Sequence, residues 1–178
     1  MSENQISIKS WKSPVGELIL GSIDDKLCLC DWKYRKLRDK VDTRLKEALN
    51  ANYIEKESPI VLQTITQLEE YFEGNRKTFD IPLRLAGTPF QVSVWKTLLR
   101  VNYGYTESYL GLATVLGKVD AIRAVASANG ANAISILIPC HRIIGKDGKL
   151  TGYAGGLKAK KELLELEGAI SSSQPSLF

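Results

Sequence analysis

A cysteine and the only histidine of the chain are neighbours in the run Ile138-Pro139-Cys140-His141-Arg142. A thiol is a poor nucleophile until a base removes its proton, and a free cysteine is only slightly ionised at neutral pH. The apolar residues 134–138 precede this run and predict a stiff strand that would bring thiol, imidazole and guanidinium to one place. The residue types therefore predict nucleophilic chemistry at Cys140, with a buried structural Cys–His pair as the alternative.

Adjacency disfavours a direct Cys140–His141 pair, because neighbouring side chains on a regular strand point to opposite faces. A water that bridges thiol and imidazole is easier, with a carboxylate fixing the other ring nitrogen. Glu167 fits this role, because it falls near the middle of the apolar face of a helix predicted at 157–167. A carboxylate aimed at a core needs a partner, and His141 and Lys160 are the candidates. The alternative for Glu167 is a last-turn residue frayed into water.

The other two cysteines, Cys28 and Cys30, share a face of a predicted strand. Zinc needs four ligands, and no further Cys or His is free to complete a set with them. We therefore expect core cysteines and no metal site. Three cysteines without framework spacing also favour a reducing cytoplasm.

Composition is that of an ordinary globular protein, with 44% hydrophobic and 25% charged residues. No apolar stretch approaches the length of a membrane span, and the first residues do not resemble a signal peptide. The net charge of +4 lies wholly in residues 88–178, because residues 1–87 hold 14 of the 24 basic and 14 of the 20 acidic residues. A polyanion such as DNA would be drawn to the part that contains Cys140.

The first part of the chain predicts a small α+β unit without obvious chemistry. Short strands joined by turns are expected within residues 5–32, and helices within 36–50 and 59–72. Residues 80–85 are compatible with a returning strand. A domain boundary is expected near Gly87.

The second part predicts three short helices followed by strands and Gly-rich loops. Thr88, Pro89 and Gln91 together give an N-cap, a first-turn proline and a capping box for a helix that runs to about Val101. Further helices fit residues 108–116, capped by Ser108, and residues 120–128. This order suggests a helix-turn-helix with a wing.

The third of these helices has a face that suits close approach to DNA. A helical wheel turns Ile122 and Val125 towards a core, and the opposite face holds Asp120, Arg123, Ala124 and Ser127. One arginine among small side chains fits a minor-groove binder that inserts a side chain without reading sequence. The alternative is an ordinary surface helix with an Asp120–Arg123 ion pair.

Three segments of the second part carry a family resemblance: the run 138–142 around Cys140, the run 128–132 before it and the run Gly152-Tyr153-Ala154-Gly155-Gly156-Leu157 after it. They closely resemble the O6-alkylguanine-DNA alkyltransferases, also called methylated-DNA–protein-cysteine methyltransferases. The match is dense from Thr88 to Gly168, whereas residues 1–87 resemble the family only in layout. The implied fold is α+β, with a small ribonuclease-H-like domain at 1–87, a winged helix-turn-helix domain carrying the active-site cysteine at 88–168, and a flexible tail at 169–178.

The resemblance implies DNA repair by direct damage reversal. The protein would flip O6-alkylguanine, and as a further candidate O4-alkylthymine, out of duplex DNA and move the alkyl group to Cys140. It would act once, because a thioether has no good leaving group, and it would need no cofactor. The implied catalytic residues are Cys140 as nucleophile, His141 as base through water, Glu167 to orient it, Asn132 to brace the turn and Tyr109 to assist the leaving guanine. The implied substrate-binding residues are Ile143, Tyr153, Ala154 and Gly155, and the implied DNA-binding residues are Arg123, Tyr109, Ala124, Ser127, Lys118 and Lys146.

The chain departs from the family pattern at two places that face DNA. Residues 117–120 replace the Asn-Pro-Lys that relatives often have, so Asp120 adds a negative charge, and Glu107 adds another before Tyr109. We expect weaker non-specific DNA binding as a result. The stretch Gln174–Phe178 also looks like the motif by which bacterial proteins dock on the replication sliding clamp, and this stays a hypothesis. A monomer is expected, because no apolar stripe is self-complementary.

Two other functional classes remain open from the sequence. A DNA-binding regulator with an incidental thiol would prefer one operator sequence over damaged DNA. A cysteine hydrolase would turn over many times, and the adjacency of Cys140 and His141 speaks against it.

Overall fold

Alternating apolar residues near the start of the chain form an antiparallel meander of β1 (Asn4–Ser13), β2 (Gly16–Ile23) and β3 (Lys26–Trp32). The β2–β3 turn places Asp24 and Asp25 at φ 50° and 58°, which fits a tight hairpin turn with two left-handed residues. The structure is a computed structural model, and it describes residues 3–171. The proposed clamp motif Gln174–Phe178 lies outside these residues. The chain divides into two units that meet between Gly87 and Thr88.

A fourth strand, β4 (Ala51–Glu55), pairs in parallel with β1, so the sheet order is β3-β2-β1-β4. The sequence analysis missed this strand, because it is only five residues long and follows α1 directly after the left-handed Asn50. The predicted returning strand at 80–85 is wrong in extent. Leu83 makes only an isolated bridge with Leu27, held by hydrogen bonds on either side of it.

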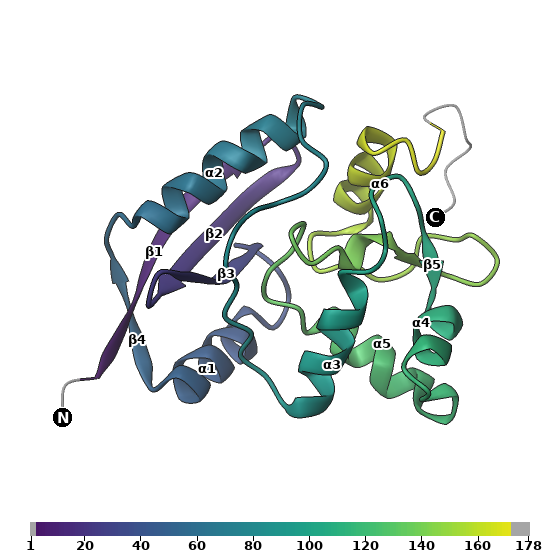
Figure 1. Ribbon diagram of the computed structural model, residues 1–178, viewed down its shortest axis with the longest axis horizontal. Coiled ribbons are helices and arrows are strands. Elements are labelled where there is room, and N and C mark those ends of the chain that lie inside the picture. Colours follow the sequence, from purple (N-terminus) through teal and green to yellow (C-terminus); the bar gives the residue numbers. More distant parts are fainter. Residues whose placement is uncertain (1–2, 172–178) are drawn as a thin grey trace. The chain divides into compact units, whose positions relative to one another are not determined.

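Two helices cover the sheet of the first unit, α1 (Arg38–Leu49) and α2 (Pro59–Phe72), on opposite faces (Figure 1). Helix α1 is tied to its face of the sheet by Arg38, whose Nη1 donates to Asp31 on β3 at 3.0 Å. The α2 face is joined through the N-cap Ser58, whose hydroxyl lies 2.6 Å from that of Ser22 on β2. Both helices agree with the sequence expectation to within two residues.

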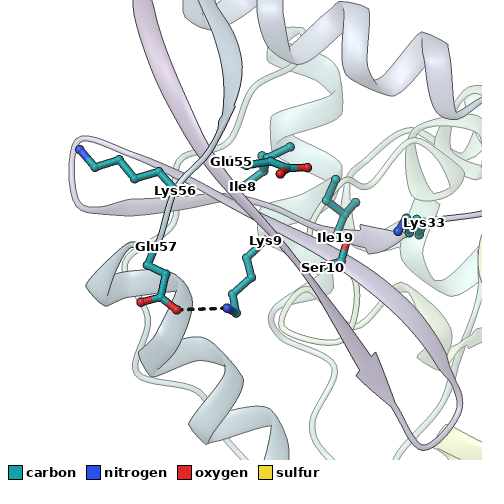
Figure 2. A pocket seen from close by; sticks show the side chains of 8 residues that line it. All are labelled: Ile8, Lys9, Ser10, Ile19, Lys33, Glu55, Lys56 and Glu57. Carbon is teal, nitrogen blue, oxygen red and sulfur yellow. Dashed lines mark hydrogen bonds and ion pairs between the residues drawn. The ribbon is translucent and has the colours of Figure 1, made fainter.

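A hollow of about 450 Å³ lies on this sheet. Figure 2 shows the side chains that line it, among them Lys9 and Glu57, whose charged atoms are 3.2 Å apart. Its walls carry charges of both signs. None of the residues predicted for the active site lines this hollow. All of them belong to the second unit.

Three helices of the second unit pack on one another: α3 (Pro89–Leu98), α4 (Tyr109–Val115) and α5 (Ile122–Gly130) (Figure 1). The predicted capping box at Thr88 and Gln91 is present, and so is the Ser108 cap of α4. The indole Nε1 of Trp95 donates to the Ala128 carbonyl at 2.8 Å and ties α3 to α5. Helix α3 ends three residues earlier than expected, and α5 begins later, because Val119–Ala121 form the 3-10 turn η1.

The strand predicted at 134–138 is wrong. Residues 134–138 form a tight turn with a Ser135–Ile138 bridge, and Cys140–Arg142 form the 3-10 turn η2. The Asn132 side chain causes this local fold, because it accepts from the Ile134 amide at 3.0 Å and donates to the Ile138 carbonyl at 2.9 Å. Ile136 adopts φ 72°, which is rare for a β-branched residue.

The remaining elements of the second unit are a two-stranded parallel sheet and the last helix. β5 (Glu107–Ser108) pairs with β6 (Ile143–Ile144), and α6 spans Leu157–Leu166. A turn closed by the Gly145 amide and the Lys149 carbonyl at 2.8 Å follows β6, where the wing was expected. Among residues 3–171, no helix has both the length and the apolar character needed to cross a membrane.

Candidate active site

Cys140 opens η2 and is almost fully buried, with 4% of its surface exposed. The Nδ2 atom of Asn132 lies 3.2 Å from its Sγ and also donates to the Ile138 carbonyl. Asn132 is itself 1% exposed. The asparagine therefore both shapes the turn and offers a hydrogen bond to the sulfur, where it would favour a thiolate.

His141 is fully buried, and its ring uses one nitrogen to bind a carboxylate. Nε2 lies 2.7 Å from Oε1 of Glu167, and Nδ1 has no hydrogen-bond partner among the described residues. Burial lowers the pKa of His141; the Glu167 carboxylate opposes this shift, and the charges of Arg142 and Lys160 reinforce it. The neutral ring therefore donates from Nε2 to Glu167 and carries its lone pair on Nδ1.

Within residues 3–171, Cys140 and His141 make no direct pair, because Nε2 binds Glu167 and Nδ1 has no partner. The sequence analysis expected the absence of a direct pair because side chains alternate along a strand, and that reason was wrong. Both residues lie in a 3-10 turn, where successive side chains point about 120° apart. A thiol and an imidazole at such an angle can be joined through one water.

Glu167 caps the C-terminus of α6 and is 5% exposed, so the frayed alternative is wrong. Arg142 binds it with a two-pronged contact, Nε to Oε2 at 2.8 Å and Nη2 to Oε1 at 2.9 Å. Burial alone would raise the pKa of Glu167, but the hydrogen bonds and charges of His141 and Arg142 outweigh it and lower the pKa to about 2. The sequence analysis missed Arg142 as a partner, although a buried carboxylate beside one neutral histidine signals a missing cation.

Lys160 is fully buried on α6, but it does not bind Glu167, so that part of the expectation is wrong. Its Nζ donates to the carbonyls of Ile143 at 2.5 Å and Thr151 at 2.9 Å. These carbonyls flank the turn that follows β6. Burial lowers the pKa of the Lys160 ammonium to about 8. Lys160 therefore fixes both ends of this turn.

The residues expected to bind the base surround this core. The Tyr109 hydroxyl donates to the Thr151 carbonyl at 3.3 Å, and burial raises the pKa of Tyr109. The ring of Tyr153 lies 6.4 Å from that of His141 in an edge-on arrangement. Ile143 is buried in β6, whereas Ala154 and Gly155 are partly exposed beside Tyr153.

The predicted DNA-facing residues lie on the surface of the second unit. Arg123, Ala124 and Ser127 are exposed on α5, while Val125 is buried on the opposite side. Asp120 and Arg123 form no ion pair in the described part of the chain. The exposed lysines Lys118 and Lys146 precede η1 and follow β6 respectively.

Glu107 is folded over the first turn of α4 rather than extended into solvent. Its Oε1 accepts from the Ser108 amide at 2.7 Å. The carboxylate occupies the space that a side chain on Gly111 would take. Of the two carboxylates expected near DNA, that of Glu107 therefore already accepts a hydrogen bond from a backbone amide.

Cys28 and Cys30 are buried thiols in β3. Burial raises the pKa of Cys28 to about 12 and raises that of Cys30 further. Both thiols stay protonated and unreactive at neutral pH.

Comparison with known proteins identifies the family. The family model described as "6-O-methylguanine DNA methyltransferase, DNA binding domain" matches residues 89–169, and the model of the ribonuclease-like domain of the same family matches residues 7–85. The constitutive methylated-DNA–protein-cysteine methyltransferase of Bacillus subtilis is 43% identical over 157 residues, which covers 88% of this chain and 92% of that protein. The chain belongs to this methyltransferase family.

Solved structures of the family support the fold as well. The crystal structure of Mycobacterium tuberculosis OGT in complex with DNA matches with a TM-score of 0.77 and 38% identity, covering 93% of each chain. A methyltransferase from Methanosarcina barkeri is also 43% identical, over 156 residues that cover 88% of this chain and 93% of that protein. The predicted α+β class, with an N-terminal domain and a DNA-binding domain, is confirmed.

Proposed function

We propose that this chain is a methylated-DNA–protein-cysteine S-methyltransferase that repairs O6-alkylguanine in duplex DNA by moving the alkyl group to Cys140. The observation that supports it most strongly is the buried relay at η2. Glu167 holds His141 through Nε2, and Nδ1 is left to accept the thiol proton through a water. The similarity to methyltransferases over nearly the whole chain points to the same reaction.

The transfer is an in-line displacement at the alkyl carbon. The Sγ of Cys140 forms a bond to that carbon while the bond from carbon to O6 of guanine breaks, and the electron pair stays on the guanine. The proton that left the thiol is balanced by one that the guanine gains, and Tyr109 is placed to assist this step. No cofactor or metal takes part, and the thioether product limits each molecule to one transfer.

The target base must leave the duplex before Cys140 can reach it. Flipping costs a few kcal/mol of unstacking. The exposed Arg123 on α5 would fill the gap in the stack, with Ala124 and Ser127 allowing close approach. Lys118 and Lys146 would contact phosphates. The flipped base would lie against Ile143, Tyr153, Ala154 and Gly155, with Asn132 bracing the turn below.

The decisive experiment is intact-mass measurement after incubation with a duplex containing O6-methylguanine. One methyl group gained on the Cys140 peptide, in proportion to protein, is the expected result, and a matched duplex with O4-methylthymine tests the second lesion. Cys140→Ser is the control that gains nothing. A folded wild-type protein that gains no mass, or that prefers one undamaged operator sequence, would exclude the repair function.

We further propose that Gln174–Phe178 docks on the replication sliding clamp, on the strength of its Gln-x-Ser-Leu-Phe pattern alone. Deletion of these five residues should abolish clamp binding and leave alkyl transfer on short duplexes unchanged. Equal clamp binding by both forms contradicts the proposal.

The protein is also proposed to act as a cytoplasmic monomer. Three cysteines that are outside any disulfide suit a reducing compartment, and the sequence has no self-complementary apolar stripe. Light scattering of the purified protein should give the mass of one chain, 19.7 kDa.

A further inference from the structure

The guanidinium of Arg142 contacts the carboxylate that holds His141, the proposed general base. It holds both oxygens of Glu167, and one of these oxygens is also the acceptor for His141 Nε2. Arg142 is anchored in turn, because its Nη1 donates to the Val101 carbonyl at 2.6 Å. The Glu167 carboxylate is therefore held in one plane by a two-pronged contact that a lysine cannot make.

The charges at this site nearly cancel. Glu167 and Arg142 form a buried pair with side-chain exposures of 0% and 8%. The other titratable groups around His141 are Lys160 from α6, Cys140 from η2 and Tyr153, and Tyr103 stacks near Arg142. Without the arginine, the buried Glu167 carboxylate would lack its guanidinium partner. Protonation of His141 would then supply the nearest positive charge, so the His141–Glu167 pair would gain a proton.

We propose that Arg142 is a positioning residue that keeps His141 neutral in the resting protein, with Nδ1 unprotonated, by holding Glu167 as a carboxylate in one orientation. The inference rests on the proposed function, in which His141 accepts the proton of Cys140. A histidine that is already protonated cannot accept it. Arg142 would thus determine the lowest pH at which His141 can still accept the proton of Cys140.

The single histidine of the chain allows a direct measurement, because imidazole 15N NMR shows one residue only. In the wild-type protein the spectrum at pH 7 should show a neutral ring with the proton on Nε2. In Arg142→Gln the His141 pKa should rise by about one unit or more, since a charge within ~4–6 Å shifts a pKa by ~1–3 units. An imidazolium in the wild type at pH 7, or an unchanged pKa in the folded variant, overturns the proposal.

The rate of alkyl transfer should follow the same protonation. The acid limb of its pH profile should move upward with the His141 pKa, so that for a one-unit shift the rate in Arg142→Gln falls to half its plateau about one pH unit higher than in the wild type. A role in folding alone would slow transfer equally at all pH values. A uniform loss with an unmoved acid limb therefore contradicts the inference.

Two further variants separate charge from shape. Arg142→Lys keeps the charge, so His141 should stay neutral at pH 7 while transfer slows, because an ammonium cannot hold both carboxylate oxygens in one plane. If Arg142→Gln does not fold, the double variant Arg142→Gln/Glu167→Gln removes both charges and should return the His141 pKa to within about half a unit of the wild-type value. A strongly raised pKa in either variant counts against the proposal.

The matched control is Arg100→Gln, which removes an exposed arginine elsewhere in the second unit and should leave the His141 pKa unchanged. The NMR result does not depend on alkyl transfer. If wild-type protein transfers no alkyl group, the proposed function fails while the protonation of His141 is still measured. If transfer occurs but Arg142 does not affect His141, only the inference fails.

Discussion

At the scale of single residues, the site consists of buried polar groups that are each held by a named partner. Glu167, Lys160 and Asn132 are almost fully buried, and each binds either His141 or the backbone of a turn near Cys140. Buried charges of this kind are costly unless they are paired, so their removal should be visible in stability as well as in activity.

Glu167 predicts a specific acid response. Its pKa is about 2 in the folded protein and 4.5 ordinarily, so its stabilising contribution is complete above pH 4.5 and is lost as the pH falls towards 2. Glu167→Gln should therefore flatten the fall in unfolding free energy between pH 4.5 and 2. Chemical denaturation across this range measures the effect. Glu162→Gln, which disrupts an exposed ion pair on the same helix, should keep the wild-type slope.

Lys160 predicts a response of the same sign, but in the alkaline range. Its folded pKa of about 8 lies below the ordinary 10.5, so between these values the unfolded chain binds more protons and this residue makes stability rise with pH. The unfolding free energy of the wild type minus that of Lys160→Met should increase from pH 8 to 10.5. A constant difference would mean that Lys160 is not buried as a cation. Alkyl transfer should fall too, because the ends of the turn at Ile143 and Thr151 are released.

At the scale of elements, α5 presents a surface made of small side chains with one arginine. Arg123 is exposed and, within the described residues, makes no ion pair with Asp120, so it is available to enter DNA. Arg123→Ala should slow transfer from duplex DNA about tenfold or more, since ~1.4 kcal/mol of lost support for the flipped state is a factor of ten.

The same variant should react normally with the free base O6-methylguanine, which needs no flipping. Single-turnover rates on duplex and on free base give the comparison. Lys158→Gln, an exposed change on α6, is the control. An equal loss on both substrates would place Arg123 in the chemistry rather than in flipping.

Local signals explain which elements the sequence could predict. Helix α3 was predicted with the correct start because Thr88, Pro89 and Gln91 act within one turn, and α2 was predicted from apolar residues that share one face. The run 134–138 was predicted as a strand because its composition is apolar and β-branched. Its turn depends on Asn132 bonding across six residues to Ile138, which propensity does not contain.

The site was predictable to the extent that its residues are adjacent or carry a motif. Cys140, His141 and Arg142 are contiguous, and Glu167 was found from its place on an apolar helix face. Of the two expected partners of Glu167, His141 is present and Lys160 is not, and Arg142 was missed, because these contacts depend on how α6 meets η2 in space. Spacing along the chain does not encode that contact.

At the scale of the whole molecule, the excess positive charge and the site lie in the same part of the sequence. Residues 88–178 carry the net +4, and the first unit is neutral overall. Since each phosphate that a protein neutralises adds about 0.9 to the salt slope of DNA binding, Lys146→Gln should reduce this slope by about 1. Lys36→Gln in the first unit should leave it unchanged. Equal effects of the two substitutions would contradict a DNA surface confined to the second unit.

The carboxylate of Glu107, folded into the space above Gly111, has a consequence for how this chain can evolve. Alanine at a helical position is ordinarily about 1 kcal/mol better than glycine. Here Gly111→Ala would displace the carboxylate from the Ser108 amide, so the gain is offset by a lost cap of about 0.5–2 kcal/mol. After Glu107→Ala the same change should stabilise the protein. The pair should therefore be non-additive in a double-mutant cycle of thermal stability, with Gly111→Ala more favourable after Glu107→Ala than in the wild type.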